Sequence, residues 1–290
     1  MKDKICMVTG ANAGIGKETV IGLARQGATV VMVARNAEKG EAARAQIIAS
    51  TGNTNIHLLI ADMSSRQSIE HMVLEFRSRF NRLNVLVNNA GVFLMNREES
   101  AEGLELTFAT NHLGYFITTL LLWDSLRAGS PSRVINVSSD AHRQAKLNFD
   151  DLQNRKNYRG FQAYSQSKLA NVLFTYELNR RREGAEITVN ALHPGFVASN
   201  FGRNNRGMVG FAMKKIVPWI ARSEAEGATT PIYLATSEEV AGKSGKYYVK
   251  CAPVRSSAAS YDMKTAEQLW TISEAITGLS FPTPLDQTPD

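Results

Sequence analysis

The chain reads Thr9-Gly10-Ala11-Asn12-Ala13-Gly14-Ile15-Gly16 where a short apolar run gives way to a helical pattern, and this stretch decides its fold. Glycine permits a tight turn and a close approach of the backbone to a ligand. The free amides and the positive dipole end of a helix N-terminus suit a pyrophosphate. The spacing is not G-x-G-x-x-G, and a merely tight strand-to-helix turn would have the same composition, so the residues around the turn must decide between these interpretations.

Outward from this turn, apolar strand-like runs alternate with helical patterns along the whole chain. The gaps between runs are too long for hairpins and call for parallel strands joined by helices. The predicted strands are 4–9, 28–34, 56–60, 83–88, 133–138, 187–192 and 245–249. The sequence therefore predicts an α/β protein, a single doubly wound Rossmann-type domain over 1–290 with a mainly parallel seven-stranded sheet and helices on both faces. A substrate lid around 200–222 and a C-terminal extension after about 250 complete this prediction.

Composition excludes several classes of protein. With 290 residues, 43% hydrophobic and 21% charged, the chain has the make-up of an ordinary globular protein. None of its apolar stretches approaches the roughly 20 residues of a membrane helix, and its N-terminus lacks the features of a signal peptide, so we expect a cytoplasmic protein without a transmembrane segment. The two cysteines, Cys6 and Cys251, do not support a metal site, and Cys6 is expected to be buried.

The charge pattern favours a phosphorylated ligand over nucleic acid. Lys and Arg number 33 against 27 Asp and Glu, but this excess of six is scattered along the chain. Its densest run, Arg180–Arg182, ends a predicted helix, where cations complement the helix dipole. No nucleic-acid partner is expected, since no binding motif accompanies the charge.

The end of the second predicted strand bears on the choice of cofactor. An NAD-binding protein usually places a carboxylate there for the ribose 2′-hydroxyl. This chain has Ala34, Arg35 and Asn36 instead. A guanidinium can bind a 2′-phosphate bidentately, so NADP is favoured, with Lys39 as a second cation. The alternative is a surface arginine without a ligand.

Two further strands end in candidate cofactor contacts. The third closes with Asp62 and Met63, and the fourth with Asn89, Ala90 and Gly91. Asp62 can accept a hydrogen bond from an adenine amino group, and the small residues let the chain run close under a dinucleotide. Asp62 can equally cap the helix that follows.

The fifth predicted strand ends in Ser138 and Ser139, and Tyr164 and Lys168 follow on a helix predicted over 162–182. Residues four apart share one face of a helix. A free tyrosine has a pKa of about 10, and a nearby ammonium lowers it by favouring the phenolate. Taken alone, the pair is more typical of a solvated helix face.

Together these motifs resemble the short-chain dehydrogenase/reductase family. The resemblance rests on TGxxxGxG, Asn88-Asn89-Ala90-Gly91, Asn111, Ser139, Tyr164-x-x-x-Lys168 and Pro194-Gly195, in order and approximate spacing. It covers nearly the whole chain. Within the family, the retinol dehydrogenase-like branch is the most similar, on the strings at 33–40, 148–152 and 269–274.

The resemblance implies a role for each catalytic candidate. Tyr164 is the general acid and base, and Lys168 lowers its pKa and holds the nicotinamide ribose. Ser139, chosen over Ser138 because the family uses the second serine of such a pair, stabilises charge on the reacting oxygen. Asn111 anchors a water that links Lys168 to solvent. NADP(H) supplies the hydride.

The resemblance also assigns the turn after the sixth strand, which reads His193-Pro194-Gly195-Phe196-Val197-Ala198-Ser199. In the family this turn lies against the nicotinamide, so Pro194, Gly195, Val197 and Ser199 are expected cofactor contacts. The family does not use the histidine as a base, and we expect packing or a backbone contact for His193.

The segment 201–222 is rich in Gly, Phe, Met and Trp, which suits a pliant lid over a lipophilic substrate. A peripheral membrane helix or an oligomer contact are the rival interpretations, since Lys214, Lys215 and Arg222 accompany the apolar residues. Family members are often dimers or tetramers, so a homo-oligomer is expected.

The predicted function is that of an NADP-dependent oxidoreductase acting on a hydrophobic alcohol, aldehyde or ketone. A nucleotide-sugar epimerase shares the Tyr and Lys but usually has a different glycine spacing. A regulatory protein that binds NADP without turnover is the remaining alternative. Animal retinol dehydrogenases commonly begin with a hydrophobic anchor that Met1–Lys4 does not resemble, so a natural substrate other than a retinoid is expected.

Overall fold

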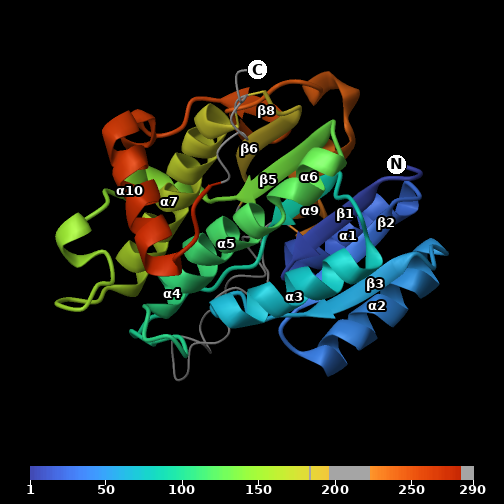
Figure 1. Cartoon of the computed structure of the whole chain (residues 1–290), viewed down its shortest axis with the longest axis horizontal. Helices are drawn as coiled ribbons and strands as arrows, with labels where there is room; N and C mark the ends of the chain where they lie inside the picture. The colour runs from blue at the N-terminus through green and yellow to red at the C-terminus, as the bar shows by residue number, and fades with distance from the viewer. Residues whose placement is uncertain (183, 196–222, 282–290) are drawn as a thin grey trace, which may run out of the picture.

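One twisted sheet organises the protein, as the computed structural model shows for residues 1–182, 184–195 and 223–281 (Figure 1). The strands lie in the order β3-β2-β1-β4-β5-β6-β7-β8. All neighbours pair in parallel except β7 and β8, which are antiparallel. The strands are β1 (Ile5–Thr9), β2 (Thr29–Ala34), β3 (Ile56–Ile60), β4 (Val85–Asn88), β5 (Ser132–Val137), β6 (Ile187–His193), β7 (Tyr247–Val249) and β8 (Ala252–Val254).

The doubly wound α/β class is confirmed, but the strand count of seven is wrong. The seven predicted strands all form, and β8 adds an eighth at the edge of the sheet. Lys250 and Cys251 join it to β7, with φ values of 50° and 61°, which is the left-handed backbone of a two-residue hairpin turn. β8 is only three residues long, contains Pro253 and is exposed throughout, so it lacked the long apolar run of a buried strand.

Helices cover both faces of the sheet. They are α1 (Gly14–Arg25), α2 (Ala37–Thr51), α3 (Arg66–Arg79), α4 (Leu106–Phe108), α5 (Gly114–Leu121), α6 (Trp123–Ala128), α7 (Gly160–Arg181), α9 (Glu224–Thr236) and α10 (Met263–Thr277). In Figure 1, α3, α5 and α7 lie in front of the strands, whereas α1 and α9 lie behind them. The C-terminal helix α10 runs along α7 on the front face.

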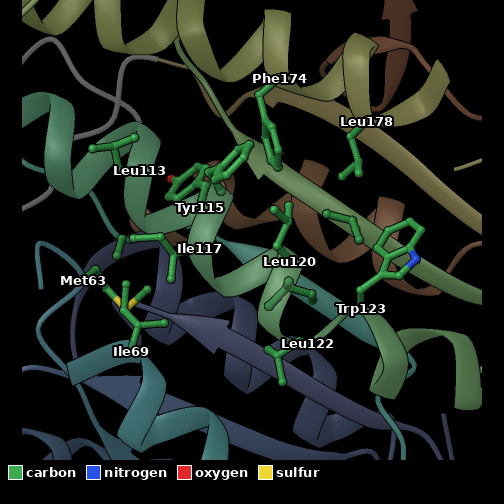
Figure 2. Packing of buried hydrophobic residues seen from close by; sticks show 14 of the residues in the cluster. Met63, Ile69, Leu113, Tyr115, Ile117, Leu120, Leu122, Trp123, Phe174 and Leu178 are labelled. Atoms are coloured by element: carbon green, nitrogen blue, oxygen red, sulfur yellow. The ribbon is translucent and has the colours of Figure 1, made fainter. Parts of the chain in front are cut away.

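Successive side chains along each strand point to opposite faces of the sheet and enter two separate cores. On β2, Val31 and Val33 enter the cluster under α3, α5 and α7, whereas Val30 and Met32 enter the cluster under α1 and α9. A sheet buried on both faces explains why its strands read as continuous apolar runs. Figure 2 shows the front cluster, in which Trp123 and the Tyr115 ring pack among aliphatic side chains. Cys6 on β1 is fully buried and free, as predicted.

The sheet order places the site. The chain leaves β1 toward β2 and β3 on one side and continues through β4 on the other, so the crossovers diverge between β1 and β4. Ligands of open α/β sheets bind outside the carboxyl ends of the strands at such a switch point. The glycine-rich turn follows β1, and the Asn89–Gly91 segment follows β4 directly beside it.

Candidate active site

A cavity of about 1040 Å³ lies at the carboxyl ends of the strands, near the upper end of the volumes typical of ligand pockets. It brings together most of the residues that the sequence predicts to bind a cofactor or react. They are Gly10, Asn12, Ala13, Gly14, Ile15, Gly16, Arg35, Asn36, Lys39, Asp62, Met63, Asn89, Ala90, Gly91, Ser139, Tyr164, Lys168, Pro194 and Gly195. Asn111 does not line the cavity. Val197, Ser199 and the predicted lid at 200–222 lie outside the described residues.

The glycine-rich turn is built by close backbone packing. Gly10 has a φ of 66°, and a Cβ there would lie 2.8 Å from the Cα of Ala90. A Cβ on Gly16 would lie 2.4 Å from the carbonyl oxygen of Gly10. Ala13 is the N-cap of α1, and no side chain caps this helix end. The turn therefore presents uncapped helix amides to the cavity, which fits the pyrophosphate of a dinucleotide.

Asn89 supports this turn from β4. Its side-chain amide donates to the carbonyl oxygens of Thr9 at 2.8 Å and Gly10 at 3.3 Å. The Thr9 hydroxyl in turn accepts the backbone N–H groups of Asn89 and Ala90 at 2.9 and 3.0 Å. The two strand ends are locked together, so the predicted ligand contact at Asn89 is also a structural clamp.

The end of β2 carries the exposed cations that the sequence singled out. The side chain of Arg35 is 65% exposed, and its guanidinium lies 3.9 Å from Asp62. Asn36 caps α2 by accepting the N–H of Lys39 at 2.8 Å. The other oxygen of Asp62 accepts the backbone N–H and hydroxyl of Ser64 at 2.9 and 2.7 Å.

The alternative that Asp62 caps the following helix is wrong, because Ser65 caps α3 instead. The Asp62 carboxylate instead closes a local turn with Ser64, before the helix begins, so it does not accept the free amides of α3. The second oxygen of the Asp62 carboxylate faces Arg35 and can accept a hydrogen bond from a ligand.

Tyr164 and Lys168 lie one helical turn apart on α7, both deeply buried. The ammonium of Lys168 donates to the carbonyl oxygen of Val137 at 3.0 Å and lies 5.7 Å from the centroid of the tyrosine ring. The ring of Phe93 packs edge-on against Tyr164 with centroids 5.6 Å apart. This pair is therefore not a solvated helix face but part of the cavity wall.

The two serines that end β5 have separate partners. The Ser138 hydroxyl donates to the carbonyl oxygen of Lys168 at 2.8 Å and holds β5 against α7. The Ser139 hydroxyl lies beside the side chain of Tyr164 and lowers the pKa of its phenol. The geometry thus supports Ser139 rather than Ser138 as the serine that acts beside the tyrosine.

Burial governs the protonation of the Tyr–Lys pair. Desolvation raises the pKa of Tyr164 to about 12, although the neighbouring Ser139 hydroxyl acts to lower it. Desolvation also lowers the pKa of Lys168 from 10.5 to about 7. The sequence predicts that the lysine lowers the pKa of the tyrosine. The structure differs because the buried ammonium that would stabilise a phenolate is itself disfavoured.

Asn111 occupies a π-helical turn, Ala109–Leu113, between α4 and α5. Its side-chain oxygen accepts the N–H of Val92 at 2.7 Å. Its amide donates to the carbonyl oxygen of Val92 at 3.0 Å and to the hydroxyl of Ser167 at 2.9 Å. The side chain fastens the segment after β4 to α7, so its contribution is to position the residues beside Lys168.

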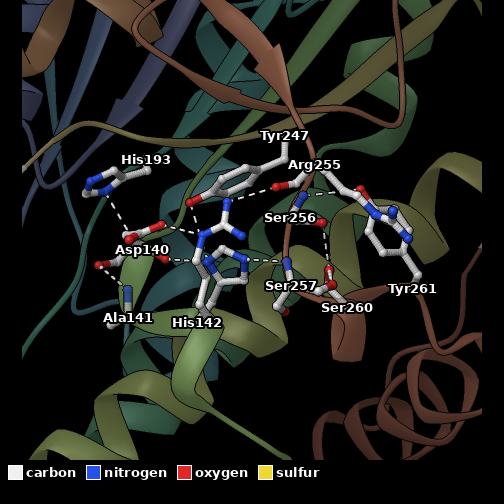
Figure 3. Close-up of polar contacts among 12 residues, drawn as sticks. Asp140, Ala141, His142, His193, Tyr247, Arg255, Ser256, Ser257, Ser260 and Tyr261 are labelled. Carbon is white, nitrogen blue, oxygen red and sulfur yellow. Dashed lines mark hydrogen bonds and ion pairs between the residues drawn. The ribbon is translucent and has the colours of Figure 1, made fainter.

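His193, at the end of β6, makes the backbone contact that the sequence favours over a catalytic role. Its Nδ1 atom accepts the N–H of Asp140 at 3.2 Å. Figure 3 shows this contact beside the polar cluster around His142. Both His193 and Asp140 line the cavity.

Sequence reasoning missed the wall of the cavity next to Tyr164. This wall includes Val92, Phe93, Thr110, Gln144 and Phe161. Phe161 is 53% exposed although it is a large apolar side chain. It precedes Tyr164 by three residues, so helical spacing could have placed it on the same face.

The described residues contain neither a metal-binding cluster nor a membrane-spanning helix. Within 1–182, 184–195 and 223–281, no three His, Cys, Asp or Glu side chains gather as a metal site. No helix in these ranges combines the length and apolar character needed to cross a bilayer.

Comparisons with known proteins agree with this geometry. The family model described as short chain dehydrogenase matches residues 4–209. The chain is 39% identical to mouse retinol dehydrogenase 12, over 96% of this chain and 87% of that protein. It is 41% identical to human retinol dehydrogenase 13, over 98% and 87%.

Solved structures show the same fold. A putative uncharacterized protein from Mycobacterium paratuberculosis superposes with a TM-score of 0.77 at 31% identity, covering 97% of this chain and 96% of that chain. The Pseudomonas aeruginosa RhlG/NADP active-site complex has a TM-score of 0.68 at 25% identity, covering 85% and 94%.

Proposed function

The chain belongs to the short-chain dehydrogenase/reductase family of oxidoreductases, and from this premise we propose that it transfers hydride between NADP(H) and a hydrophobic alcohol, aldehyde or ketone. One observation carries the proposal. Ser139 and Tyr164 lie side by side in the wall of the cavity that extends to the glycine-rich turn, and the serine hydroxyl lowers the pKa of the phenol. This places a proton donor and a second hydrogen-bonding group where a carbonyl oxygen would bind.

Each residue of the site has its own role in the reaction. NADPH, when bound, supplies the hydride. Tyr164 gives its proton to the carbonyl oxygen during reduction, while Ser139 hydrogen-bonds the same oxygen and stabilises its growing charge. Lys168, held by Val137, stabilises the phenolate that remains once the proton has left.

The protonation states support reduction in this cavity. Because burial raises the pKa of Tyr164 to about 12, the phenol keeps its proton at neutral pH and is ready to donate it. Oxidation of an alcohol requires the phenolate, which needs Lys168 in its charged form. Because burial lowers the pKa of Lys168 to about 7, the charged ammonium is only partly populated at neutral pH. Hydrogen-bond acceptors on a bound ribose would favour it.

Preference for NADP over NAD is proposed from the end of β2. The position lacks a carboxylate for a ribose 2′-hydroxyl, and Arg35 and Lys39 line the cavity there. A guanidinium that is mostly exposed can turn toward a 2′-phosphate and bind it bidentately. The similar P. aeruginosa protein is an NADP active-site complex, which supports the same preference.

A lipophilic substrate is proposed from the apolar residues near Tyr164. Phe93 and Phe161 flank Tyr164, so apolar surface surrounds the reacting position. The similar proteins are named as dehydrogenases of retinol, a lipophilic alcohol. The predicted lid at 200–222 stays a prediction, and we propose that the C-terminal extension after about 250 belongs to the same domain. Cytoplasmic localisation, peripheral membrane contact and a homo-oligomer stay predictions.

A consumption screen tests the proposal. Purified protein is given NADPH or NADH with aliphatic, aromatic, steroid and retinoid carbonyls, and cofactor oxidation is followed by absorbance. We expect turnover of at least one lipophilic carbonyl, faster with NADPH. Binding of NADPH with no turnover of any class would favour the regulatory alternative, and faster turnover with NADH would contradict the role of Arg35.

A further inference from the structure

The turn that carries Ser139 is held by a buried histidine outside the predicted catalytic set. Ser139 begins a 3-10 turn over Asp140–Gln144, and its hydroxyl accepts the N–H of Ala141 at 3.3 Å. His142 lies within this turn and is fully buried. Its Nδ1 atom lies 2.7 Å from the carbonyl oxygen of Ser139 itself. The ring therefore touches the backbone of the residue whose hydroxyl lies beside Tyr164.

The partners of the ring fix its tautomer. The backbone N–H of Ser257 can only donate, and it donates to Nε2 of His142 at 3.0 Å. Nε2 must then be the unprotonated nitrogen, so the proton sits on Nδ1. From there it is donated to the Ser139 carbonyl, which can only accept. The ring of Tyr247 packs at 4.8 Å from the imidazole, and its hydroxyl lies 3.4 Å from Nδ1.

Ser257 belongs to a C-terminal segment, 255–261, that is itself rigidly held. The Ser257 carbonyl oxygen accepts the hydroxyl of Ser260 at 2.6 Å. The Ser256 hydroxyl pairs with those of Ser260 and Tyr176, both at 2.7 Å, which ties the segment to α7. Figure 3 shows the segment beside the imidazole, on the side away from His193.

A second bond joins the same segment to the turn. Arg143 donates to the carbonyl oxygen of Arg255 at 2.8 Å and to the Asp140 carboxylate at 2.6 Å. On the opposite side, the N–H of Asp140 is held by His193. The backbone around Ser139 is thus supported from β6 on one side and from the C-terminal segment on the other.

We infer that His142 is a positioning residue for Ser139, and that segment 255–261 is the anchor on which it holds the turn. The inference rests on the proposed function, because the position of Ser139 matters only if its hydroxyl meets the reacting oxygen. A donor displaced by about 1 Å can cost about 100-fold in rate even when substrate binding is unchanged. Burial lowers the pKa of His142, which keeps the ring in the neutral form that both bonds require.

Three substitutions of His142 separate positioning from packing. The amide nitrogen of Asn can take the place of Nδ1 and donate to the Ser139 carbonyl. The longer Gln reaches instead toward Ser257, and Ala removes both bonds. The control is Leu178→Ala, which opens a cavity at the far end of α7 and lowers stability without touching the turn.

We expect His142→Ala to lower kcat by about 10- to 100-fold, while the NADPH dissociation constant changes by less than about threefold. His142→Asn should restore most of the lost kcat, and His142→Gln should not. Equal kcat in the Asn and Gln variants would overturn the inference, as would a kcat of His142→Ala within twofold of wild type. An equal loss of kcat in Leu178→Ala at a matched melting temperature would also overturn it.

Nuclear magnetic resonance of the unaltered protein gives a test that needs no activity. The chain has five histidines, so the ring nitrogens of His142 can be assigned by their loss in His142→Asn. We expect the neutral Nδ1–H tautomer at pH 7, and an Nε2–H tautomer or a charged ring would overturn the inference. Absence of wild-type turnover would refute the proposed function as well. Turnover that is lost in Tyr164→Phe but kept in His142→Ala would refute the positioning role alone.

Discussion

Replacing Arg35 by Ala should reduce the preference of the enzyme for NADPH over NADH. The guanidinium is 65% exposed, so a salt bridge to a 2′-phosphate is screened and adds at most about 1 kcal/mol. A hydrogen bond to a charged group adds about 1.5–3 kcal/mol. The exposure places the total near the lower end of that range, about 1.5–2 kcal/mol. At about 1.4 kcal/mol per decade, this corresponds to about 10- to 30-fold in the ratio of kcat/KM values.

A second effect acts in the same direction. Asp62 lies 3.9 Å from the guanidinium, so the substitution leaves its carboxylate without this neighbouring cation. The negative charge would then repel a 2′-phosphate.

The assay measures kcat/KM for NADPH and NADH with one lipophilic carbonyl, at low and high salt. The wild-type preference should weaken in 1 M salt, where the screening length falls to about 3 Å. Arg25→Ala is the matched control. Arg25 is exposed, and its substitution removes the same charge at the other end of α1, about 16 Å from the glycine-rich turn. A cofactor ratio in Arg35→Ala within twofold of wild type would refute the reasoning, as would an equal change in the control.

Three other substitutions test the site and the fold. Gly16→Ala places a Cβ 2.4 Å from the backbone oxygen of Gly10 and should weaken NADPH binding by about 10- to 100-fold in a fluorescence titration; unchanged affinity would contradict the tight turn. The pKa of Lys168 is depressed to about 7, so the unfolded state binds more protons between pH 7 and 10, and wild-type stability should rise across that window. Lys168→Met lacks this rise, so its unfolding free energy relative to wild type should fall from pH 7 to pH 10 in denaturant titrations. The opposite slope would contradict a lowered pKa for the buried Lys168 amine. Trp270→Ala removes a buried ring stacked 5.8 Å from Phe174 and should cost about 3–5 kcal/mol, or about 6–15 °C in melting temperature; a change under 2 °C would show that α10 contributes little to the core.

The positions of the parallel strands along the chain could be predicted because each buried parallel strand is a continuous apolar run, and a helix must separate it from the next parallel strand. Two-sided burial makes these runs visible without knowledge of their partners. The edge strand β8 lacked this signal, since Ala252–Val254 is exposed and its turn, Lys250-Cys251, contains none of the residues typical of hairpins.

The candidate cofactor contacts were predictable for a related reason. Parallel strands all end at one edge of the sheet, so residues that close strands meet there even when far apart in sequence. Protonation was not predictable in this way. The pKa of Tyr164 depends on how many groups exclude water from it, and that number follows from the packing of the whole domain.

His142 gave no signal at all. Its two hydrogen bonds go to backbone atoms, which any residue type supplies, and one of them belongs to Ser257, 115 residues further along the chain. Such a contact leaves no trace in spacing or composition. It became visible only when the structure placed the C-terminal segment beside the turn that begins with Ser139 (Figure 3).

The most direct test of Tyr164 as the proton donor compares Tyr164→Phe with wild type in two measurements on the same preparation. NADPH affinity, read by fluorescence, should stay within about threefold, because Phe fills the same buried space. Turnover of the best carbonyl from the consumption screen should fall by about 100- to 10,000-fold, the usual contribution of a general acid. Turnover within tenfold of wild type, with NADPH still bound, would contradict the central role of this phenol.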